Sequence, residues 1–552
     1  MIKLLFAFII IGNSSLSAKA ENYRINTTYN SDTTPGLKKI IVQILDENKI
    51  TTAARVRVTE KDTVYYPPDT NTAGFTVSEA GGDVMLDNNR RFAYVEGSFT
   101  YHLPETNLRF EVIKGYAYSF YDTVIQVTAQ TDSIQIQMKK WFDFPGKKWY
   151  SGDVHVHHID PATALLEMKA EDINVCNILT SDFTSDQDRF RGGPEISSDT
   201  NHIVYVNQEY REDRLGHLNL LNLKKLIEPV TKMRPYQYPL NMKAADETHA
   251  QGGHVSWAHF ASWPGLEGPL AIVLKKIDAV ELLCAIDPFY EPVFISEVVP
   301  DLKMNSGLRI WYRLLNCGLR IPATAGTDKM NKRVSVGANR VYAIIDGKFN
   351  YQSWIEALTA GRSFVSNSPF IFCRVNDKIA GDELHITGKK TLTIEAEMFT
   401  QLPVDRLEII VNGNVVAEKI VKPGEKHALL KFTYTPQKSV WVAARVHQFS
   451  QEFAFEGVSF QQRRDAGAGA TLFNRYYGTS RPETVFAHTN PVYVLVNQKP
   501  IRSSADAEYF QQYLKNSYSW LDTSGKFPDA KSKQEVLDAF KKGIDTFIQL
   551  AK

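Results

Sequence analysis

The sequence predicts a multidomain protein in which an α/β unit is flanked by two β-sandwich-like domains and followed by C-terminal helices. Three observations predict this class. Short β-branched segments with period-two alternation run from about residue 35 to 140, strands then alternate with helical patterns after Trp149, and period-two alternation returns near Pro369. The chain has 552 residues, which is long enough for several domains.

The first segment, residues 1–20, is MIKLLFAFIIIGNSSLSAKA, with Lys3 before a short apolar run and a closing Ala-Lys-Ala. This pattern is typical of a secretory signal peptide. The apolar run is shorter than the roughly 20 residues that a membrane span needs. We therefore expect export, to the periplasm or to the outside of the cell, and no integral membrane segment.

Residues 21–145 are expected to form the N-terminal β-sandwich domain. Segments such as KKIIVQILDE, AARVRVTE and LRFEVIKG are short, rich in β-branched residues and separated by Pro, Gly, Asn or Asp. Period-two patterning of this kind predicts antiparallel strands.

Residues 146–368 are expected to form the α/β unit. Apolar segments such as INVCNILTSD, NHIVYVNQE and IDAVELLCA alternate with the helical patterns DPATALLEMKAEDI, PLNMKAADETHAQ and YQSWIEALTAG. The alternation of strand and helix predicts a parallel sheet or a barrel.

Residues 369–500 are expected to form the second β-sandwich, in which VNGN is a hairpin turn and PVYVLVNQKPI the last strand. Residues 501–552 are expected to form two amphipathic helices. In the second helix, six apolar residues share one face: Val536, Leu537, Phe540, Ile544, Phe547 and Ile548.

The composition excludes some partner classes. The formal net charge is +1, so we expect neither nucleic acid nor an anionic membrane as a partner. The expected partner is a small-molecule or glycan-derived substrate, and the sequence leaves the oligomeric state open. Four scattered cysteines without a CxxC pair are predicted to be buried thiols: Cys176, Cys284, Cys317 and Cys373.

Histidine is concentrated in residues 149–158, WYSGDVHVHH, although the chain has only 13 histidines. His155 and His157 are two apart on a predicted strand, so their rings project from the same face. A single His-x-His pair is a weak signal. This pair, however, ends the first strand of the α/β unit, which is where α/β barrels place their sites.

Other potential ligands follow later strands. Glu209 comes after a β-branched run with His217 eight positions on, His259 ends another apolar run, and Asp328 follows a late strand. Each of these residues alone has a structural explanation, such as a hydrogen-bonded histidine or a capping aspartate. Together, their places at successive strand ends predict one metal centre.

Imidazoles combined with two carboxylates favour Zn²⁺, with Mn²⁺ or Fe²⁺ as alternatives, over Ca²⁺ or Mg²⁺. The pattern predicts two ions with a hydroxide between them, which would attack an ester-like bond. The predicted ligands are His155, His157 and Asp328 for one ion, His217 and His259 for the other, and Glu209 as the bridge.

These segments resemble the polymerase-and-histidinol-phosphatase (PHP) metallohydrolase superfamily, in particular its secreted carbaryl-hydrolase-like (CehA/McbA) branch. The resemblance extends from about residue 90 to the end of the chain. Its motifs are WYSGDVHVHH, NQEYREDRLGHLNLL, HAQGGHVSWAHF, PATAGTDK, GRSFVSNSP and AHTNPVYVLV. It implies a distorted (β/α)7 barrel whose metal centre hydrolyses phosphoesters, carboxylic esters or carbamates.

The sequence also departs from that family. Asp182 is followed by Phe183 where an Asp-His pair is expected, and Met330 stands where a histidine is expected. A further histidine expected after the first motif has no match. These losses would remove a third metal and leave two. The general acid is then open, and the nearest candidates are His158 as a proton donor and Asp182 as an orienting residue.

Five other residues are weaker candidates. Lys329 and Arg333 could bind an anionic substrate or be solvated loop charges. Arg362 and Asn367 could lie at the rim of the site, and Asp153 is expected to be structural.

The leading functional hypothesis is an exported dinuclear-metal hydrolase. The closest enzymatic alternative is an amidohydrolase-type barrel, which the spacing of Glu209 and His217 disfavours. The non-enzymatic alternative is a secreted binding protein that contains metal for structural reasons.

Overall fold

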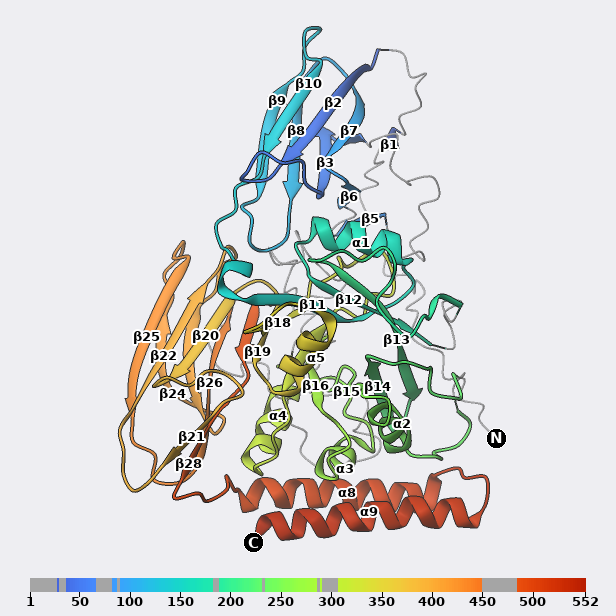
Figure 1. Ribbon diagram of the computed structural model, residues 1–552, viewed down its shortest axis with the longest axis vertical. Helices are drawn as coiled ribbons and strands as arrows, with labels where there is room; N and C mark the ends of the chain where they lie inside the picture. Colours follow the sequence, from blue (N-terminus) through green and yellow to red (C-terminus); the bar gives the residue numbers. More distant parts are fainter. Residues whose placement is uncertain are drawn as a thin grey trace, which may run out of the picture.

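The computed structural model describes residues 27–28, 36–65, 82–86, 90–181, 188–230, 234–284, 288–289, 306–448 and 484–552. Figure 1 shows an N-terminal β lobe above an α/β unit, a C-terminal β unit beside it and a helix pair beneath it. The predicted signal peptide lies outside the described residues.

The N-terminal lobe contains two sheets. Most strand pairs are antiparallel, as predicted, but β1 with β4 and β2 with β10 are parallel. The seven-stranded sheet contains β1 (Thr27–Thr28), β3 (Ala54–Glu60), β4 (Thr63–Tyr65), β5 (Asp83–Leu86), β6 (Arg90–Val95), β8 (Asn107–Ile113) and β9 (Tyr121–Gln126). The three-stranded sheet contains β2 (Lys38–Leu45), β7 (Ser98–Leu103) and β10 (Ser133–Gln137).

The α/β unit is built on a large mixed sheet that also extends into the C-terminal unit. Its strands are almost entirely buried, which accounts for the continuous apolar runs in their sequences. In this unit the sheet contains β11 (Trp149–Val156), β12 (Val175–Thr180), β13 (Ile203–Glu212), β14 (Gly216–Leu221), β15 (His254–Trp257), β16 (Ala279–Cys284), β17 (Ala323–Gly326), β18 (Arg340–Ile344) and β19 (Ser363–Ser366).

The expectation of a purely parallel arrangement is wrong. The pairs β13–β14 and β14–β15 are antiparallel, whereas β11–β12–β13 and β15–β16–β17 are parallel. The reason is local, because β13 turns directly into β14 through residues 213–215 and leaves no room for a crossover helix. Among the described strands, the pairing path starts at β17 and ends at β24 without closing into a barrel. One isolated parallel bridge joins Val156 to Lys329.

The three predicted helices of this unit are confirmed as α1 (Pro161–Ala170), α2 (Asn241–His249) and α5 (Tyr351–Thr359). The Asp160 side chain caps α1 by accepting from the backbone N–H groups of Ala162 and Thr163. The unit also contains α3 (Gly268–Val273), α4 (Gly307–Asn316) and the short 3-10 helix η2 (Pro145–Lys147).

The large sheet continues without a break into the C-terminal unit. There it contains β21 (Glu383–Ile386), β23 (Arg406–Val411), β24 (Asn414–Ile420), β26 (Val440–His447), β27 (Phe486–Thr489) and β28 (Val492–Val496). A separate sheet is formed by β20 (Phe370–Val375), β22 (Leu392–Phe399) and β25 (His427–Tyr434). The predicted VNGN hairpin joins β23 to β24, with Asn412 and Gly413 both at positive φ.

The N-terminal lobe contacts the loop that follows β17, residues 327–339. Lys332 Nζ lies 2.8 Å from the Asp83 carboxylate of β5, and both side chains are buried. The backbone N–H of Met85 donates to the Lys332 carbonyl at 2.6 Å, and the Tyr116 hydroxyl donates to the Ala338 carbonyl at 2.6 Å. This loop is therefore held from outside the α/β unit.

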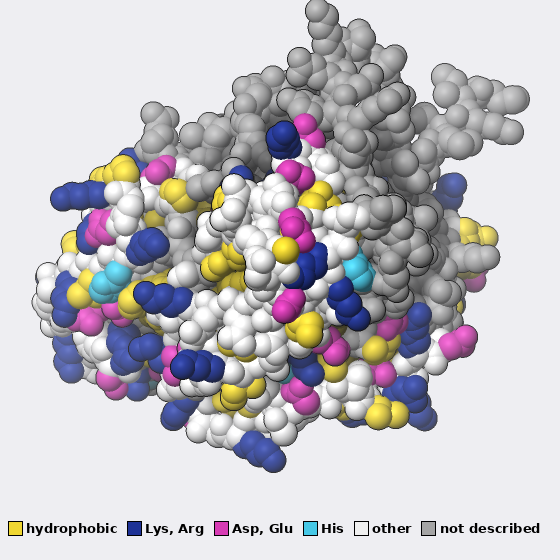
Figure 2. All heavy atoms as spheres, turned by 90° about the horizontal axis from the view of Figure 1, so that it is seen from above, with side chains coloured by type: hydrophobic (Ala, Val, Ile, Leu, Met, Phe, Trp, Pro, Cys, Tyr) yellow, Lys and Arg dark blue, Asp and Glu magenta, His cyan; other side chains and the backbone are white. Residues whose placement is uncertain are grey.

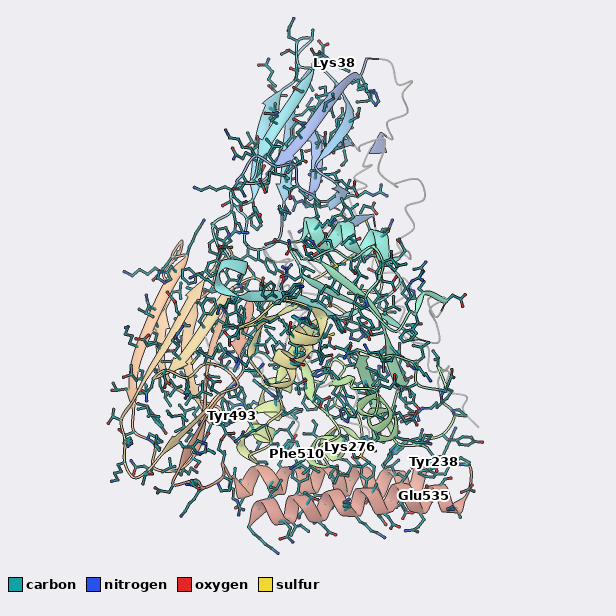
Figure 3. All side chains as sticks on the ribbon, viewed as in Figure 1. Lys38, Tyr238, Lys276, Tyr493, Phe510 and Glu535 are labelled. Carbon is teal, nitrogen blue, oxygen red and sulfur yellow. The ribbon has the colours of Figure 1, made fainter. Side chains whose placement is uncertain are left out.

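The chain ends in the predicted helix pair, α8 (Ser504–Ser524) and α9 (Ala530–Ala551), which packs beneath α3 and α4 (Figure 1). The Tyr513 hydroxyl donates to the Gly265 carbonyl at 2.6 Å. Figure 3 shows Tyr238 beside Glu535 of α9, where the tyrosine hydroxyl donates to the carboxylate at 2.9 Å. Of the predicted apolar face, Val536, Leu537, Phe540 and Phe547 are buried, and Ile544 and Ile548 are half-buried.

Two further expectations concern cysteines and membranes. All four cysteines are free thiols and buried, as predicted. In the described part of the chain, no helix combines the length and apolar character needed to cross a bilayer. Figure 2 shows one face of the molecule, on which Lys and Arg side chains are interspersed with Asp and Glu, in keeping with the small net charge.

Replacement of Phe540 by Ala should loosen the helix pair. The ring is fully buried, so its loss should lower the free energy of unfolding by about 3–5 kcal/mol through lost burial and a cavity. Urea unfolding followed by circular dichroism measures this change. Lys541→Ala, on the exposed side of the same turn, is the control and should change it little. Equal stability of the two variants would contradict the described packing.

Candidate metal centre

The six predicted metal ligands converge at the ends of five strands. His155 and His157 lie at the end of β11, Glu209 in β13 and His217 in β14. His259 follows β15, and Asp328 follows β17. In the structure these side chains fall into two groups of three, each with its ligand atoms within 4.8 Å of one another.

The first group contains His155, His157 and Asp328. The two Nε2 atoms are 3.0 Å apart, and Asp328 Oδ1 lies 3.5 Å from the first and 3.7 Å from the second. The three atoms are close enough together to share one ion: the nearest point equidistant from them, in their own plane, is about 2.0 Å from each, and zinc bonds to imidazole nitrogen and carboxylate oxygen are about 2.0–2.2 Å long. The residues therefore fit a divalent metal ion.

The second group contains Glu209, His217 and His259. Glu209 Oε1 lies 3.1 Å from His217 Nδ1 and 3.7 Å from His259 Nε2, and the two nitrogens are 3.2 Å apart. The equidistant point is again about 2 Å from each atom. These two groups of side chains could each bind a metal ion.

Glu209 lies between the two groups. While its Oε1 atom faces His217 and His259, its Oε2 atom lies 3.4 Å from His157 Nε2, and Oε1 is 3.8 Å from His155 Nε2. A carboxylate with one oxygen toward each group has the arrangement expected of a bridging ligand.

The outward nitrogens of three imidazoles are held by neighbouring oxygens. His155 Nδ1 is 3.1 Å from Glu281 Oε2, His157 Nδ1 is 2.7 Å from the Leu179 carbonyl, and His217 Nε2 is 3.1 Å from Asp213 Oδ1. Partners of this kind fix the tautomer and the ring orientation of a metal-ligating histidine. They leave the other nitrogen of each ring directed at the centre.

Glu281 and Asp213 were missed by the sequence analysis. Glu281 is buried in β16, and its Oε2 atom also accepts from the His259 backbone N–H at 2.6 Å. The signal was available, because an acidic residue within the apolar run AVELLC needs a partner in the core. A third group of possible ligands is His155, Glu281 and Cys284, which shares His155 with the first group.

Asp153 joins the first strand to the loop that contains Asp328. Its Oδ1 atom accepts from the backbone N–H groups of His155 and Thr327, both at 3.0 Å. Its Oδ2 atom accepts from the Thr327 hydroxyl at 2.7 Å and from the Gly337 N–H at 2.8 Å. The geometry agrees with the structural role expected for Asp153, and it places His155 and Asp328 relative to one another.

The electrostatics of the centre favour positive charge. Burial opposes protonation of His155, but the charges of Glu281 and Asp328 raise the pKa of this imidazole to about 10. Burial also opposes ionisation of Glu209, but Arg211 and hydrogen bonds from the surrounding histidines hold the pKa of this carboxyl well below its usual range. The carboxylates that would stabilise an imidazolium would equally stabilise a bound cation.

Backbone conformation marks the same strand ends. His158, His259 and Asp328 all have positive φ, at 55°, 34° and 46°. Such φ values are uncommon outside glycine and gather at functional sites. The His158 ring is half-buried and 6.1 Å from that of His157. Asp182, the other predicted catalytic residue, lies outside the described residues.

Two weaker predictions, for Lys329 and Arg362, are wrong, and the place of Asn367 at the rim stays a prediction. Lys329 is neither an anion ligand nor a solvated charge, because its Nζ is buried beneath α1, where it donates to the Val334 carbonyl at 2.6 Å. Asn367 is buried and bonded to the backbone of residues 484 and 486. Arg362 pairs with Asp346 beyond the Trp149 end of β11, the end opposite to His155. Arg333 is exposed.

Comparisons with known proteins assign no family. No family model matches the chain, and no curated protein matches it. Among solved structures, the chain is similar to PsfC from Pseudomonas syringae PB-5123, with a TM-score of 0.27 and 15% identity over 38% of this chain and 90% of that chain. The site is therefore interpreted from its own residues.

Replacement of Asp153 by Asn should disturb the centre without removing a predicted ligand. The amide NH₂ of the new Asn side chain would face one of the N–H groups that now donate to the Asp153 carboxylate. Two donors facing each other should lower the free energy of unfolding by about 1–3 kcal/mol. Zinc affinity should fall by about tenfold or more, as for other residues that orient ligands. Zinc titration against a competing chelator measures the affinity. Asp122→Asn, which removes an exposed ion pair in the N-terminal lobe, is the control. Unchanged zinc affinity in Asp153→Asn would contradict the positioning role.

Proposed function

We propose that this protein is an exported hydrolase that depends on two divalent metal ions and cleaves a phosphoester, carboxylic ester or carbamate-like bond. The observation that supports this function most strongly is the pair of three-residue groups that meet at Glu209. With Glu209 shared, the first ion would have four protein ligands and the second ion three. A catalytic zinc typically has three protein ligands and an open position, so the second ion would have room for water and substrate.

His155, His157 and Asp328 would hold one ion, His217 and His259 the other, and Glu209 both. When bound, a pair of divalent ions supplies an activated water and neutralises charge on the substrate oxygen. The donor set of imidazoles and carboxylates favours zinc, with manganese or iron as alternatives. The residues of the chain would fix the ions, orient the rings and exclude bulk water from a buried centre.

His158 is the proposed proton donor to the leaving group. It follows the last ligand of β11, and its ring is half-buried beside that of His157. Imidazole is suited to this role because its ordinary pKa lies near neutral pH. Asp182 remains a proposed orienting residue.

We also propose membership of the PHP superfamily, in its CehA/McbA branch, with strands β11 to β17 forming the distorted (β/α)7 barrel of that family. The parallel bridge from Val156 to Lys329 and the His157 N–H donating to the Lys329 carbonyl at 2.9 Å support this proposal, because they join the residues after β17 to β11. The order of the ligand-bearing strands supports it further. Export rests on the pattern of residues 1–20.

Metal analysis combined with two substitutions tests the function. Purified protein should contain about two ions per chain. His155→Ala should lose at least one ion, and both His155→Ala and Asp328→Asn should lower turnover by about 100-fold or more on whichever of a phosphate, acetate or carbamate 4-nitrophenyl ester is cleaved.

The matched control is His427→Ala, which removes a half-exposed histidine of β25. This variant should keep its metal and its turnover. Unchanged turnover in both His155→Ala and Asp328→Asn would refute the assignment. Metal-loaded protein that cleaves none of the esters would instead favour the non-catalytic binding protein.

A further inference from the structure

Arg211 lies on the same face of the β13–β14 hairpin as the metal-ligand groups. It follows Glu209 by two positions in β13, and its cross-strand partner in β14 is His217. Residues two apart in a strand, and residues directly opposite in an antiparallel pair, point to the same face. The Arg211 side chain is 12% exposed, and its Nη1 atom lies 3.4 Å from Glu209 Oε2. The guanidinium therefore lines the centre.

Arg211 offsets part of the buried charge of Glu209, but a bound cation would offset the same charge. Arginine is charged at every physiological pH, so it repels a cation that is held by the same carboxylate. A neutral amide could contact Glu209 Oε2 without that repulsion. A fixed positive charge here becomes favourable when a negatively charged group enters the centre beside it.

The residues that the sequence suggested for anion binding do not fill this role. Lys329 is buried beneath α1, where its ammonium lies 3.6 Å from the Glu167 carboxylate. Arg333 is exposed on the loop after β17. Arg211, in contrast, contacts Glu209 directly, and the planar guanidinium matches the oxygens of a phosphoryl group better than an ammonium does.

We propose that Arg211 is a specificity-determining residue that selects a phosphoester by holding a non-bridging oxygen of its phosphoryl group. This inference rests on the proposed hydrolase function and narrows its substrate class. In the hydrolysis, the oxygen of water bonds to phosphorus and the ester P–O bond breaks. The attacking water gives up one proton, and the electron pair of the broken bond leaves with the alcohol oxygen, which takes up one proton in exchange. Arg211 stabilises the charge on the phosphoryl oxygens during this step. A neutral ester or carbamate offers no such charge in its ground state.

A binding experiment tests the proposal without turnover. Inorganic phosphate is titrated calorimetrically into zinc-loaded full-length wild type, Arg211→Gln and Arg109→Gln, and zinc is titrated into the metal-free forms. Arg109→Gln, which removes an ion pair with Asp122 in the N-terminal lobe, is the matched control and should behave as wild type. Arg211→Gln should bind phosphate about tenfold more weakly or worse. It should bind zinc as tightly as wild type or more tightly, because a repulsive charge is gone.

Two outcomes of this experiment would overturn the proposal. Phosphate binding by Arg211→Gln that equals wild type would show that Arg211 does not hold the anion. A parallel loss of zinc and phosphate would show that Arg211 only supports Glu209.

Turnover then tests selectivity. With 4-nitrophenyl phosphate, kcat/KM of Arg211→Gln should fall by about 100-fold, while that for 4-nitrophenyl acetate should change by less than about threefold. Arg211→Lys should recover part of the loss, because it restores the charge without the planar fork. Equal losses on both substrates would overturn anion selection. If wild type cleaves none of the 4-nitrophenyl phosphate, acetate and carbamate esters, the hydrolase proposal fails, and the phosphate titration still decides the role of Arg211.

Discussion

The buried carboxylate of Glu209 is the group on which the arrangement of the centre depends. Its side chain is only 2% exposed, and an ionised carboxylate is costly in such surroundings unless it is paired and hydrogen-bonded. Histidines on both sides and the guanidinium of Arg211 supply that compensation. In return, the carboxylate is a common negative partner for four histidines: His155, His157, His217 and His259. Asp328 and Asp213 each contact the rings of one group only, so without Glu209 no carboxylate would join the two groups.

The antiparallel hairpin explains how Glu209 comes to share its surroundings with His217. A helical crossover after β13 would have returned the chain to the opposite end of the sheet, where the next parallel strand begins. The direct turn instead places His217 opposite Arg211, two pairs away from Glu209 and Asn219 on the same ladder and therefore on the same face. The spacing of eight residues between Glu209 and His217 is therefore the spacing of a hairpin. Asn219 completes the face, with its amide 3.3 Å from His155 Nδ1.

The sequence predicted the strands, most helices and the convergence of all six ligand candidates, because these follow from periodicity and from polar residues at strand ends. It could not predict the contacts between side chains on different strands, because these depend on which strands lie next to each other. Glu281 contacts His155 across 126 positions, and no local pattern encodes that pairing.

The two errors on charge have the same origin. Lys329 follows a ligand and was expected to bind an anion or face solvent, yet the loop directs it beneath α1 toward Glu167. Arg211 was passed over within a run of charges, and its place beside the centre comes from β-pairing.

The contact between Lys332 and Asp83 has a consequence for any exchange of domains. The loop that carries Asp328 on its inner side rests on the N-terminal lobe on its outer side, through an ion pair between two buried side chains. The lobe and the α/β unit are thus separate in sequence but joined four residues after Asp328. An exchange of the lobe for an unrelated β module would leave the Lys332 ammonium buried without the Asp83 carboxylate. Such a chimaera would need a matching change at position 332 to keep this loop in place.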